Sequence, residues 1–278
     1  MVAYIDVGGG MRAVYGAGVL DFCIDNKIEF PYYVGVSAGS ANIISFLGEH
    51  KGRTLRFYRD YSERPEYMSF RSYFKTKSFL NLDYIYTTLT NEGGEDPLDF
   101  DKAKSKKCKF YTVATNANTG EAVYFDFDNT QRNNHYELKA SCCIPIINKA
   151  FEYDGVEYYD GGIVDPVPFQ KALDDGCKKI IVTLTRPLDY RKQHRLSEKT
   201  IKFLLKKHPE SARRLHTSVE KYNEDIEKLI RLKKEGKALI LYPDDCCGVN
   251  TLKHEYHTVN ALYKKGYNDA QKIIDFLK

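Results

Sequence analysis

The stretch that decides the fold is residues 28–47, IEFPYYVGVSAGSANIISFL. A short β-rich run, YYV, leads into GVSAG at residues 35–39, and an apolar run of small residues typical of a helix follows. This order of strand, G-x-S-x-G and helix pushes a serine out of the backbone at a tight turn beside a helix N-terminus. Gly35 and Gly39 fit because a side chain there would crowd the turn or the packing of helix against strand. Ser37 is therefore the candidate nucleophile.

A second glycine-rich turn follows the first β-rich run of the chain. Val2–Val7 predicts a buried strand, and residues 13–23 predict a helix because apolar side chains recur there at helical spacing. Between them lies Gly8-Gly9-Gly10-Met11-Arg12. A turn that opens a helix presents unpaired backbone N–H groups, so this segment is a natural anion site.

Three kinds of anion are candidates for this turn. Gly8, Gly10 and Ala13 match the spacing of a dinucleotide-binding fingerprint. That fingerprint also needs an acidic residue after the second strand, where this chain continues into Ser37. A phosphate-binding loop of the Walker type would need a Gly-Lys-Ser/Thr that does not follow here. The third candidate is the oxyanion of an acyl-transfer intermediate, since adjacent parallel strands would bring the glycine N–H groups close to the Ser37 hydroxyl.

Strands and helices alternate through the first two thirds of the chain. Asp154-Gly155 favours a two-residue hairpin turn, and the second arm of that hairpin ends in Asp160-Gly161-Gly162. The other segments follow from their patterns: strands at residues 109–114, 121–127 and 179–184, and helices at residues 131–143 and 167–175. This alternation indicates an α/β fold with a mainly parallel sheet.

Residues 53–86 are dense in aromatic and basic side chains. They are interpreted either as a helix pair packed on the core or as a lid that offers rings to acyl chains above Ser37. Basic and aromatic residues also alternate in nucleic-acid-binding surfaces, but Asp60, Glu63 and Glu66 interrupt the pattern. We therefore do not expect a nucleic-acid partner.

The serine needs a neighbouring base to receive its proton. A histidine base would follow the order of the α/β-hydrolases, with His194, His254 or His257 as candidates, but none of these lies in a Gly-rich or strand-end setting. His254 and His257, near Cys246-Cys247, fit no standard zinc spacing.

A partly desolvated carboxylate can act as the base instead, because burial raises its pKa toward useful basicity. Asp160 is the best candidate, since it ends a strand, where sites collect in open α/β sheets. Asp165 and Asp154 are the fallbacks.

The composition is that of an ordinary soluble globular protein. Of 278 residues, 29% are charged and 42% hydrophobic, and the net charge is +4, which does not by itself imply nucleic acid. Seven cysteines, four of them in vicinal pairs without C-x-x-C, favour reduced thiols in a cytosolic setting. We expect neither a secretory signal nor a membrane span, because no basic and apolar leader and no apolar run of about 18 residues occur.

The last third of the chain is basic. Residues 197–237 hold twelve Lys and Arg against seven Asp and Glu, and apolar residues at helical spacing between 215 and 229 predict an amphipathic helix. This helix is interpreted either as docked on the sheet or as a face that rests on anionic lipid. A strand at residues 238–242 and a closing helix at residues 255–277 are expected after it.

The ordered set of motifs resembles the patatin-like phospholipase family. GGGMR at residues 8–12, GVSAG at 35–39 and DGG at 160–162 look like the three signature blocks of that family, and ASCCIP at 140–145 resembles a family block that precedes the acid. The resemblance covers about residues 1–184. It implies a three-layer α/β/α fold with a mainly parallel central sheet.

The resemblance also implies the roles of the site residues. Ser37 would be the nucleophile and Asp160 its base, in a dyad without histidine. The oxyanion hole would be formed by the turn with a further donor after the serine: Gly8, Gly9, Gly10, Met11, Arg12 and Ala38. Arg12 is interpreted as holding this turn rather than taking part in the chemistry. Gly35, Gly39, Gly161 and Gly162 would shape the two motifs around the dyad.

The predicted function is a serine acyl hydrolase of the phospholipase or lysophospholipase type. It would need no metal and no cofactor, act on lipid acyl esters, and be cytoplasmic with a peripheral contact to a membrane surface. A catalytic domain at residues 1–185 and a basic, mainly helical extension at residues 186–278 packed on it are expected. The alternative is a catalytically silent family member that binds lipid or a protein partner. The sequence leaves the oligomeric state open.

Overall fold

The central sheet extends outward from the strand that precedes the glycine turn. β1 (Val2–Asp6) lies between β2 (Tyr32–Val36) and β7 (Lys179–Thr183), and the three strands run parallel. β3 (Lys109–Asn116) continues this parallel set beside β2, and β8 (Ala238–Leu241) continues it beside β7. The glycine turn after β1 and the elbow after β2 therefore lie at the same edge of the sheet, as the sequence predicts.

Antiparallel strands complete the sheet beside β3. β6 (Val156–Asp160) and β4 (Ala122–Asp126) both pair with β3, and β5 (Phe151–Tyr153) pairs with β6. The order is β5-β6-β3-β2-β1-β7-β8, with β4 outside this path. The prediction of an α/β fold with a mainly parallel central sheet is confirmed.

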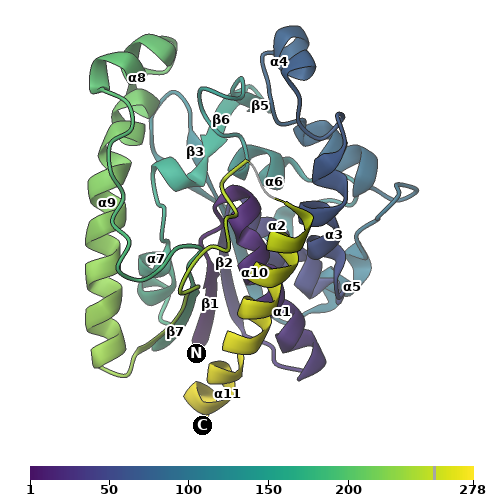
Figure 1. The fold of residues 1–278 in the computed structure, drawn as a ribbon, viewed down its shortest axis with the longest axis vertical. Helices are drawn as coiled ribbons and strands as arrows, with labels where there is room; N and C mark the ends of the chain where they lie inside the picture. The colour runs from purple at the N-terminus through teal and green to yellow at the C-terminus, as the bar shows by residue number, and fades with distance from the viewer. Residues whose placement is uncertain (253–254) are drawn as a thin grey trace.

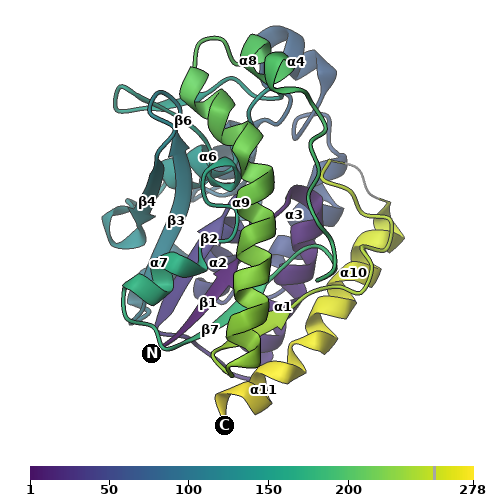
Figure 2. The same cartoon turned by 90° about the vertical axis from the view of Figure 1, so that its left-hand side faces the viewer.

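Helices cover both faces of the sheet (Figure 1). Side chains alternate along β1, so that Tyr4 joins one buried cluster while Ala3 and Ile5 join the other. The first cluster contains the side chains of α1 (Val14–Asp25), α2 (Ala38–Leu47) and α10 (Tyr256–Asp269). The second contains side chains of α7 (Phe169–Asp174) and α9 (Pro209–Lys234), which cross the opposite face in Figure 2.

The computed structural model describes residues 1–252 and 255–278, apart from the side chains of residues 71, 72 and 75. The remaining helices are α3 (Arg53–Arg59), α4 (Phe70–Thr76), α5 (Phe100–Ser105), α6 (Tyr136–Ser141), α8 (Glu198–Leu204) and α11 (Gln271–Leu277). Short 3-10 turns occupy Gly10–Ala13, Tyr61–Glu63, Phe127–Asn129 and Gly161–Ile163, and a π-helix spans Tyr84–Leu89. In the two described ranges, no helix combines the length and the apolar character that crossing a bilayer requires.

Two predicted helices differ from the structure. The helix expected at residues 131–143 is limited to α6. Asn133 adopts a left-handed conformation (φ 60°), which an α-helix cannot include, so the helix begins only after it. The single closing helix expected at residues 255–277 is two helices, α10 and α11, which meet at Ala270. Ala270 and Ile273 are fully buried at this junction, so the break between the two helices keeps both side chains packed in the core.

The C-terminal third is packed against both faces. On α9, Ile226 and Leu229 are buried against the sheet, as expected for an amphipathic helix docked there. On the other face α10 crosses α1 at very close range: a Cβ on Gly18 would lie 2.1 Å from the Tyr263 carbonyl oxygen. Only glycine allows this approach. A domain boundary near residue 185 stays a prediction.

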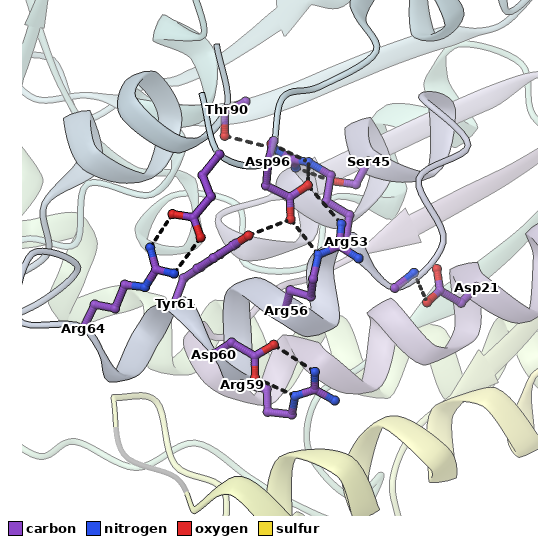
Figure 3. A network of polar contacts seen from close by, with 12 residues as sticks. Asp21, Ser45, Arg53, Arg56, Arg59, Asp60, Tyr61, Arg64, Thr90 and Asp96 are labelled. Atoms are coloured by element: carbon purple, nitrogen blue, oxygen red, sulfur yellow. Dashed lines mark hydrogen bonds and ion pairs between the residues drawn. The ribbon is translucent and has the colours of Figure 1, made fainter. Parts of the chain in front are cut away.

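A buried polar network anchors α3 (Figure 3). The guanidinium of Arg53 donates to the Asp96 backbone carbonyl, to Ser45 Oγ at 2.8 Å and to Thr90 Oγ1 at 3.0 Å. Arg56 donates to both carboxylate oxygens of Asp96, at 2.7 and 2.9 Å. A buried charge is tolerated when its hydrogen bonds are satisfied in this way. α3 is therefore packed on the core, as in the first interpretation of residues 53–86.

Candidate active site

Ser37 occupies the tight turn between β2 and α2. Its φ of 54° and ψ of −131° are rare for a residue with a side chain, and such strain is typical of functional turns. A Cβ on Gly39 would lie 2.3 Å from the Asp6 carbonyl oxygen, so the helix could not approach β1 with a larger residue there. On the other side of Ser37, a Cβ on Gly35 would lie 2.5 Å from the Ser40 Cα. The two glycines let this turn form.

The elbow is held in place from α6. The Ser37 N–H donates to Ser141 Oγ at 2.7 Å, and that hydroxyl donates in turn to the Val113 carbonyl oxygen at 2.6 Å. Ser141 is fully buried, so water does not compete for these bonds. The backbone of Ser37 is thereby fixed to α6 and β3. Ser141 belongs to the ASCCIP block, whose function the sequence alone did not reveal.

The glycine turn lies directly against the elbow. A Cβ on Gly8 would lie 2.3 Å from the Val36 carbonyl oxygen and 3.1 Å from the Ala38 nitrogen. Gly8, Gly9 and Gly10 all have positive φ angles, of 64°, 126° and 63°. Such a run of left-handed conformations is open only to glycine, so the GGG sequence is required by the shape of the turn.

The N–H groups of the glycine turn and of Ala38, at the start of α2, divide into those with a hydrogen-bond partner and those without. The Gly8 N–H donates to Asp6 Oδ1 at 3.0 Å, and the Met11 N–H donates to the Thr251 carbonyl oxygen at 3.0 Å. Across the described ranges, no acceptor is bonded to the N–H groups of Gly9, Gly10 and Ala38. Gly8 and Met11 already have partners, so among these five residues the N–H groups of Gly9, Gly10 and Ala38 are the ones that can bind an oxyanion.

Arg12 is buried beneath the turn. Its Nη1 donates to Thr251 Oγ1 at 2.9 Å, whereas its Nε has no hydrogen-bond partner in the described part of the chain. Burial, together with the nearby charge of Arg186, lowers the pKa of Arg12 to about 10. Its bond to Thr251 fits the predicted role of holding the turn.

Asp160 ends β6 at the same edge of the sheet. Its carboxylate accepts the Gly162 N–H at 2.7 Å, and Asp160 and Ser37 line the same cavity. Burial raises the pKa of Asp160 to about 6, although the nearby Ser37 side chain, the Gly162 N–H and the charge of Lys192 lower it. A Cβ on Gly161 would lie 2.3 Å from the Val113 carbonyl oxygen, so the DGG turn fits tightly on β3. The structure thus brings the two residues of the predicted dyad together.

The fallback residues lie elsewhere. Asp165 accepts a hydrogen bond from the Tyr124 hydroxyl at 2.6 Å, and Asp154 forms the hairpin turn with φ 52°. His194 bonds Glu220 at 2.7 Å, and His257 is exposed beside Glu255. His254 lies outside the described residues. Of the described histidines, none hydrogen-bonds Ser37, and no group of three His, Cys, Asp or Glu side chains in these ranges is arranged to hold a metal ion.

Two cavities meet at Ser37. The larger, about 450 Å³, extends from Ser37 and Asp160 to α9 and to the loop at residues 185–196. The smaller, about 60 Å³, is lined by aromatic and aliphatic side chains of the 53–86 segment: Phe57, Tyr58, Tyr67, Met68, Leu80, Ile85 and Tyr86. This segment therefore packs on the core and also places rings beside the serine; its action as a lid over acyl chains stays a prediction.

Two supporting residues were not predicted from the sequence. Asp6 is fully buried and binds the Gly8 N–H and, through Oδ2, the Asn42 amide at 2.9 Å. The sequence signal that could have identified Asp6 is its position at the end of the first predicted strand. Thr251 holds Met11 and Arg12 from a loop 240 residues along the chain, and no local motif marks it.

Comparison with known proteins bears on the family and the fold of the chain. The model of the patatin-like phospholipase family matches residues 7–173, and that of a domain of unknown function (DUF6363) matches residues 208–278. The uncharacterized protein YjjU of Escherichia coli strain K12 is 27% identical over 191 residues, which are 67% of this chain and 52% of YjjU. The crystal structure of VipD from Legionella pneumophila is similar in fold, with a TM-score of 0.54 and 12% identity over 98% of this chain and 66% of VipD. The chain thus spans about half the length of YjjU and under two thirds of VipD.

Proposed function

Because the chain belongs to the patatin-like phospholipase family, we propose that it hydrolyses acyl esters of lipids with a Ser37–Asp160 dyad. Family membership supports a lipid hydrolase-type function. The observation that carries the finer proposal is that a strained, buried serine lies in one cavity with a buried carboxylate whose pKa is raised to about 6. A panel of acyl esters, assayed on the wild type beside Ser37→Ala, is the direct test.

The proposed reaction uses the dyad twice. Ser37 Oγ attacks the ester carbonyl carbon while Asp160 takes the serine proton, and the resulting oxyanion is bound by the N–H groups of Gly9, Gly10 and Ala38. The tetrahedral intermediate then collapses, and Asp160 gives the proton to the leaving alcohol. A water molecule, deprotonated by Asp160, attacks the acyl-enzyme and releases the fatty acid. Ser37 then recovers its proton.

The two cavities suggest how an amphiphilic ester lies in the site. The smaller cavity presents mainly rings and aliphatic side chains, such as Phe57 and Ile85, to one side of Ser37. The larger cavity lies on the other side of Ser37, and its lining includes five charged residues: Arg12, Asp160, Arg186, Lys192 and Arg195. An acyl chain in the first and the alcohol part of the ester in the second would place the carbonyl carbon at Ser37. This supports a lipid ester as substrate.

The proposed base predicts an acid limb in the pH profile. Only the ionised Asp160 can accept a proton, so kcat/KM of a pH-insensitive ester should be half-maximal near the pKa of about 6. Below it, kcat/KM should fall about tenfold per pH unit. Asp6 also has a pKa raised to about 6 by burial, so Lys192→Met serves to separate the two. Because Lys192 lowers the pKa of Asp160, this substitution should move the limb to higher pH; an unmoved limb would assign it to another group.

We further propose that one end of the molecule rests on a lipid surface. α4 and α8 lie at the same end in both views (Figures 1 and 2). Phe70 and Phe74 on α4 and Phe203 on α8 are each at least 73% exposed, which is unusual for phenylalanine in a soluble protein. Ile201, on the other side of α8, lines the larger cavity. The exposed rings therefore lie beside the route by which a lipid would enter.

If this surface contacts lipid, removing its exposed rings should weaken binding to vesicles. Replacing Phe74 and Phe203 together by serine should weaken sedimentation with vesicles that contain anionic lipid by at least about tenfold, since each inserted ring contributes roughly 1.5–3 kcal/mol. Ile274→Ser is the matched control, because Ile274 is 39% exposed on α11 at the opposite end of the molecule. Equal binding by all three proteins would exclude the α4–α8 end as the contact surface.

A further inference from the structure

The larger cavity has a strongly cationic wall. Arg12, Arg186, Lys192 and Arg195 all line it, and Asp160 is the one carboxylate among its lining residues. Arg12 and Arg186 lie close together beside the glycine turn, and Lys192 and Arg195 lie close together beside Asp160. We call these four side chains the cationic wall.

The charges of the cationic wall are only partly neutralised by the protein, since four cations face the single carboxylate of Asp160. Throughout residues 1–252 and 255–278, none of the four forms a salt bridge in the structure. Glu220 lies near Lys192, but its carboxylate bonds the His194 ring at 2.7 Å. Burial lowers the pKa of both Arg12 and Lys192; Arg186 lowers that of Arg12 further and Arg195 that of Lys192, while Asp160 and Glu220 raise that of Lys192. Four like charges around a cavity lined by a single carboxylate are stabilised by a bound anion.

The wall is also held in position. Lys192 Nζ donates to Ser218 Oγ on α9 at 3.0 Å, and the Lys192 backbone exchanges hydrogen bonds with the Asn223 side chain at 2.8 and 3.1 Å. Arg12 is 7% exposed, and its Nε lacks a partner in the described chain. A buried guanidinium nitrogen without an acceptor is costly unless a ligand supplies one. Both features indicate that the Lys192 and Arg12 part of the wall is preformed, whereas Arg195 is exposed at its rim.

We propose that the cationic wall binds the phosphate of an ester whose polar end is net negative, and that it disfavours polar ends that carry their own cation. The inference rests on the proposed function, because it names the alcohol part of the ester that Ser37 would cleave. Arg side chains bind phosphate oxygens with charge-assisted and often bidentate hydrogen bonds. A phosphomonoester or a phosphodiester without an ammonium group satisfies this wall.

The cavity offers little to a zwitterionic head group. A quaternary ammonium is recognised by the faces of several aromatic rings, but this cavity is lined by two tyrosines, Tyr190 and Tyr222, that pack edge to face against each other, and the Tyr190 ring is also covered by the Arg186 guanidinium at 4.7 Å. The remaining counter-charge is Asp160, and an ammonium bound there would hold the base in its ionised form and lower its basicity. Choline-type or ethanolamine-type ends would therefore bring a fifth cation into a cationic space.

The first test is direct binding by the wild-type protein, which does not require turnover. Dodecyl phosphate, dodecylphosphocholine and inorganic phosphate would be titrated below their micelle concentrations and measured by calorimetry. Dodecyl phosphate should bind at least about tenfold more tightly than dodecylphosphocholine, as expected for charge-assisted bonds without a repelled cation. Equal affinities would overturn the proposal. Inorganic phosphate binding as tightly as dodecyl phosphate would overturn the assignment to a lipid head group.

Variants then test whether the cationic wall causes the preference for dodecyl phosphate over dodecylphosphocholine. The double substitution Arg186→Gln with Arg195→Gln should remove most of the difference between the two detergents. Arg213→Gln on α9 should keep it, since Arg213 faces outward and pairs with Glu210 at 2.9 Å. Arg12 and Lys192 are left unchanged because Arg12 holds the glycine turn and Lys192 lowers the pKa of Asp160. A preference that survives the double substitution would show that the wall does not set it.

Hydrolysis separates this inference from the proposed function. A lysophosphatidic ester, a lysophosphatidylcholine and a monoacylglycerol of one chain length would be compared by kcat/KM. Turnover of any of them that Ser37→Ala abolishes supports the hydrolase, whereas a ratio near one between the first two overturns only the head-group inference. Absence of all turnover together with the tenfold binding preference would overturn the proposed function and leave the phosphate site.

Discussion

Ser37→Ala is expected to abolish ester hydrolysis, with a fall in kcat of about 10⁴-fold or more. The hydroxyl oxygen is the only group in the proposed reaction that forms a bond to the acyl carbon, so no neighbouring group can replace it. Hydrolysis would be followed with a soluble short-chain ester, which requires no lipid surface. The wild type and the variant should bind substrate equally well, because the cavities are unchanged.

Ser40→Ala is the matched control for this prediction. Ser40 lies one residue beyond the GVSAG motif on α2, is fully buried, and its hydroxyl has no partner within the described residues. Its removal should leave hydrolysis and thermal stability close to those of the wild type. Residual hydrolysis by Ser37→Ala at the wild-type rate would show that another nucleophile, or a contaminating esterase, is responsible.

Asp160→Asn is expected to lower kcat by about 10³-fold, within the range for loss of a positioned general base. Asparagine has nearly the same shape and can still accept the Gly162 N–H through its carbonyl oxygen. The amide cannot take up the serine proton, so the loss reports on proton transfer rather than on folding. The acid limb near pH 6 should also disappear from the residual activity.

The control for the base is Asp165→Asn. Asp165 follows in the same loop, but its carboxylate bonds the Tyr124 hydroxyl and Lys221 rather than Ser37. Its substitution should change kcat less than about threefold, as is usual for a residue outside the reacting groups. Full activity of Asp160→Asn would show that the base is a different residue even if Ser37 is the nucleophile.

Local patterns predicted the fold and the placement of the dyad. The elbow could be recognised because strand, glycine, serine, glycine and helix are consecutive, and its conformation, with φ 54° at Ser37, is set by those few residues. Asp160 could be recognised because the Asp154-Gly155 turn fixes a hairpin whose second arm ends there. In both cases the structure follows from neighbouring residues and from the parallel order of β1 and β2.

Contacts between distant segments were not predictable in the same way. Thr251, in the C-terminal third, accepts hydrogen bonds from the Met11 N–H and the Arg12 guanidinium. The family resemblance, which counted Met11 among the oxyanion donors, gave no sign of this contact. The cationic wall likewise joins the glycine turn to residues 186–195, and a sequence cannot show that its four cations form no salt bridge with the described residues. The sequence marked the C-terminal third as basic without showing that α9 lines the cavity beside the serine.

The most direct test of the central claim is to map the product of a fluorophosphonate reaction by mass spectrometry. Such a reagent phosphonylates a serine only where a base removes its proton and donors stabilise the oxyanion. We predict one adduct, on Ser37, which forms far more slowly in Asp160→Asn and is absent in Ser37→Ala. No adduct on the wild type, or an adduct on Ser37 formed equally fast in Asp160→Asn, would contradict the claim that the glycine turn, the serine and the carboxylate act as one site.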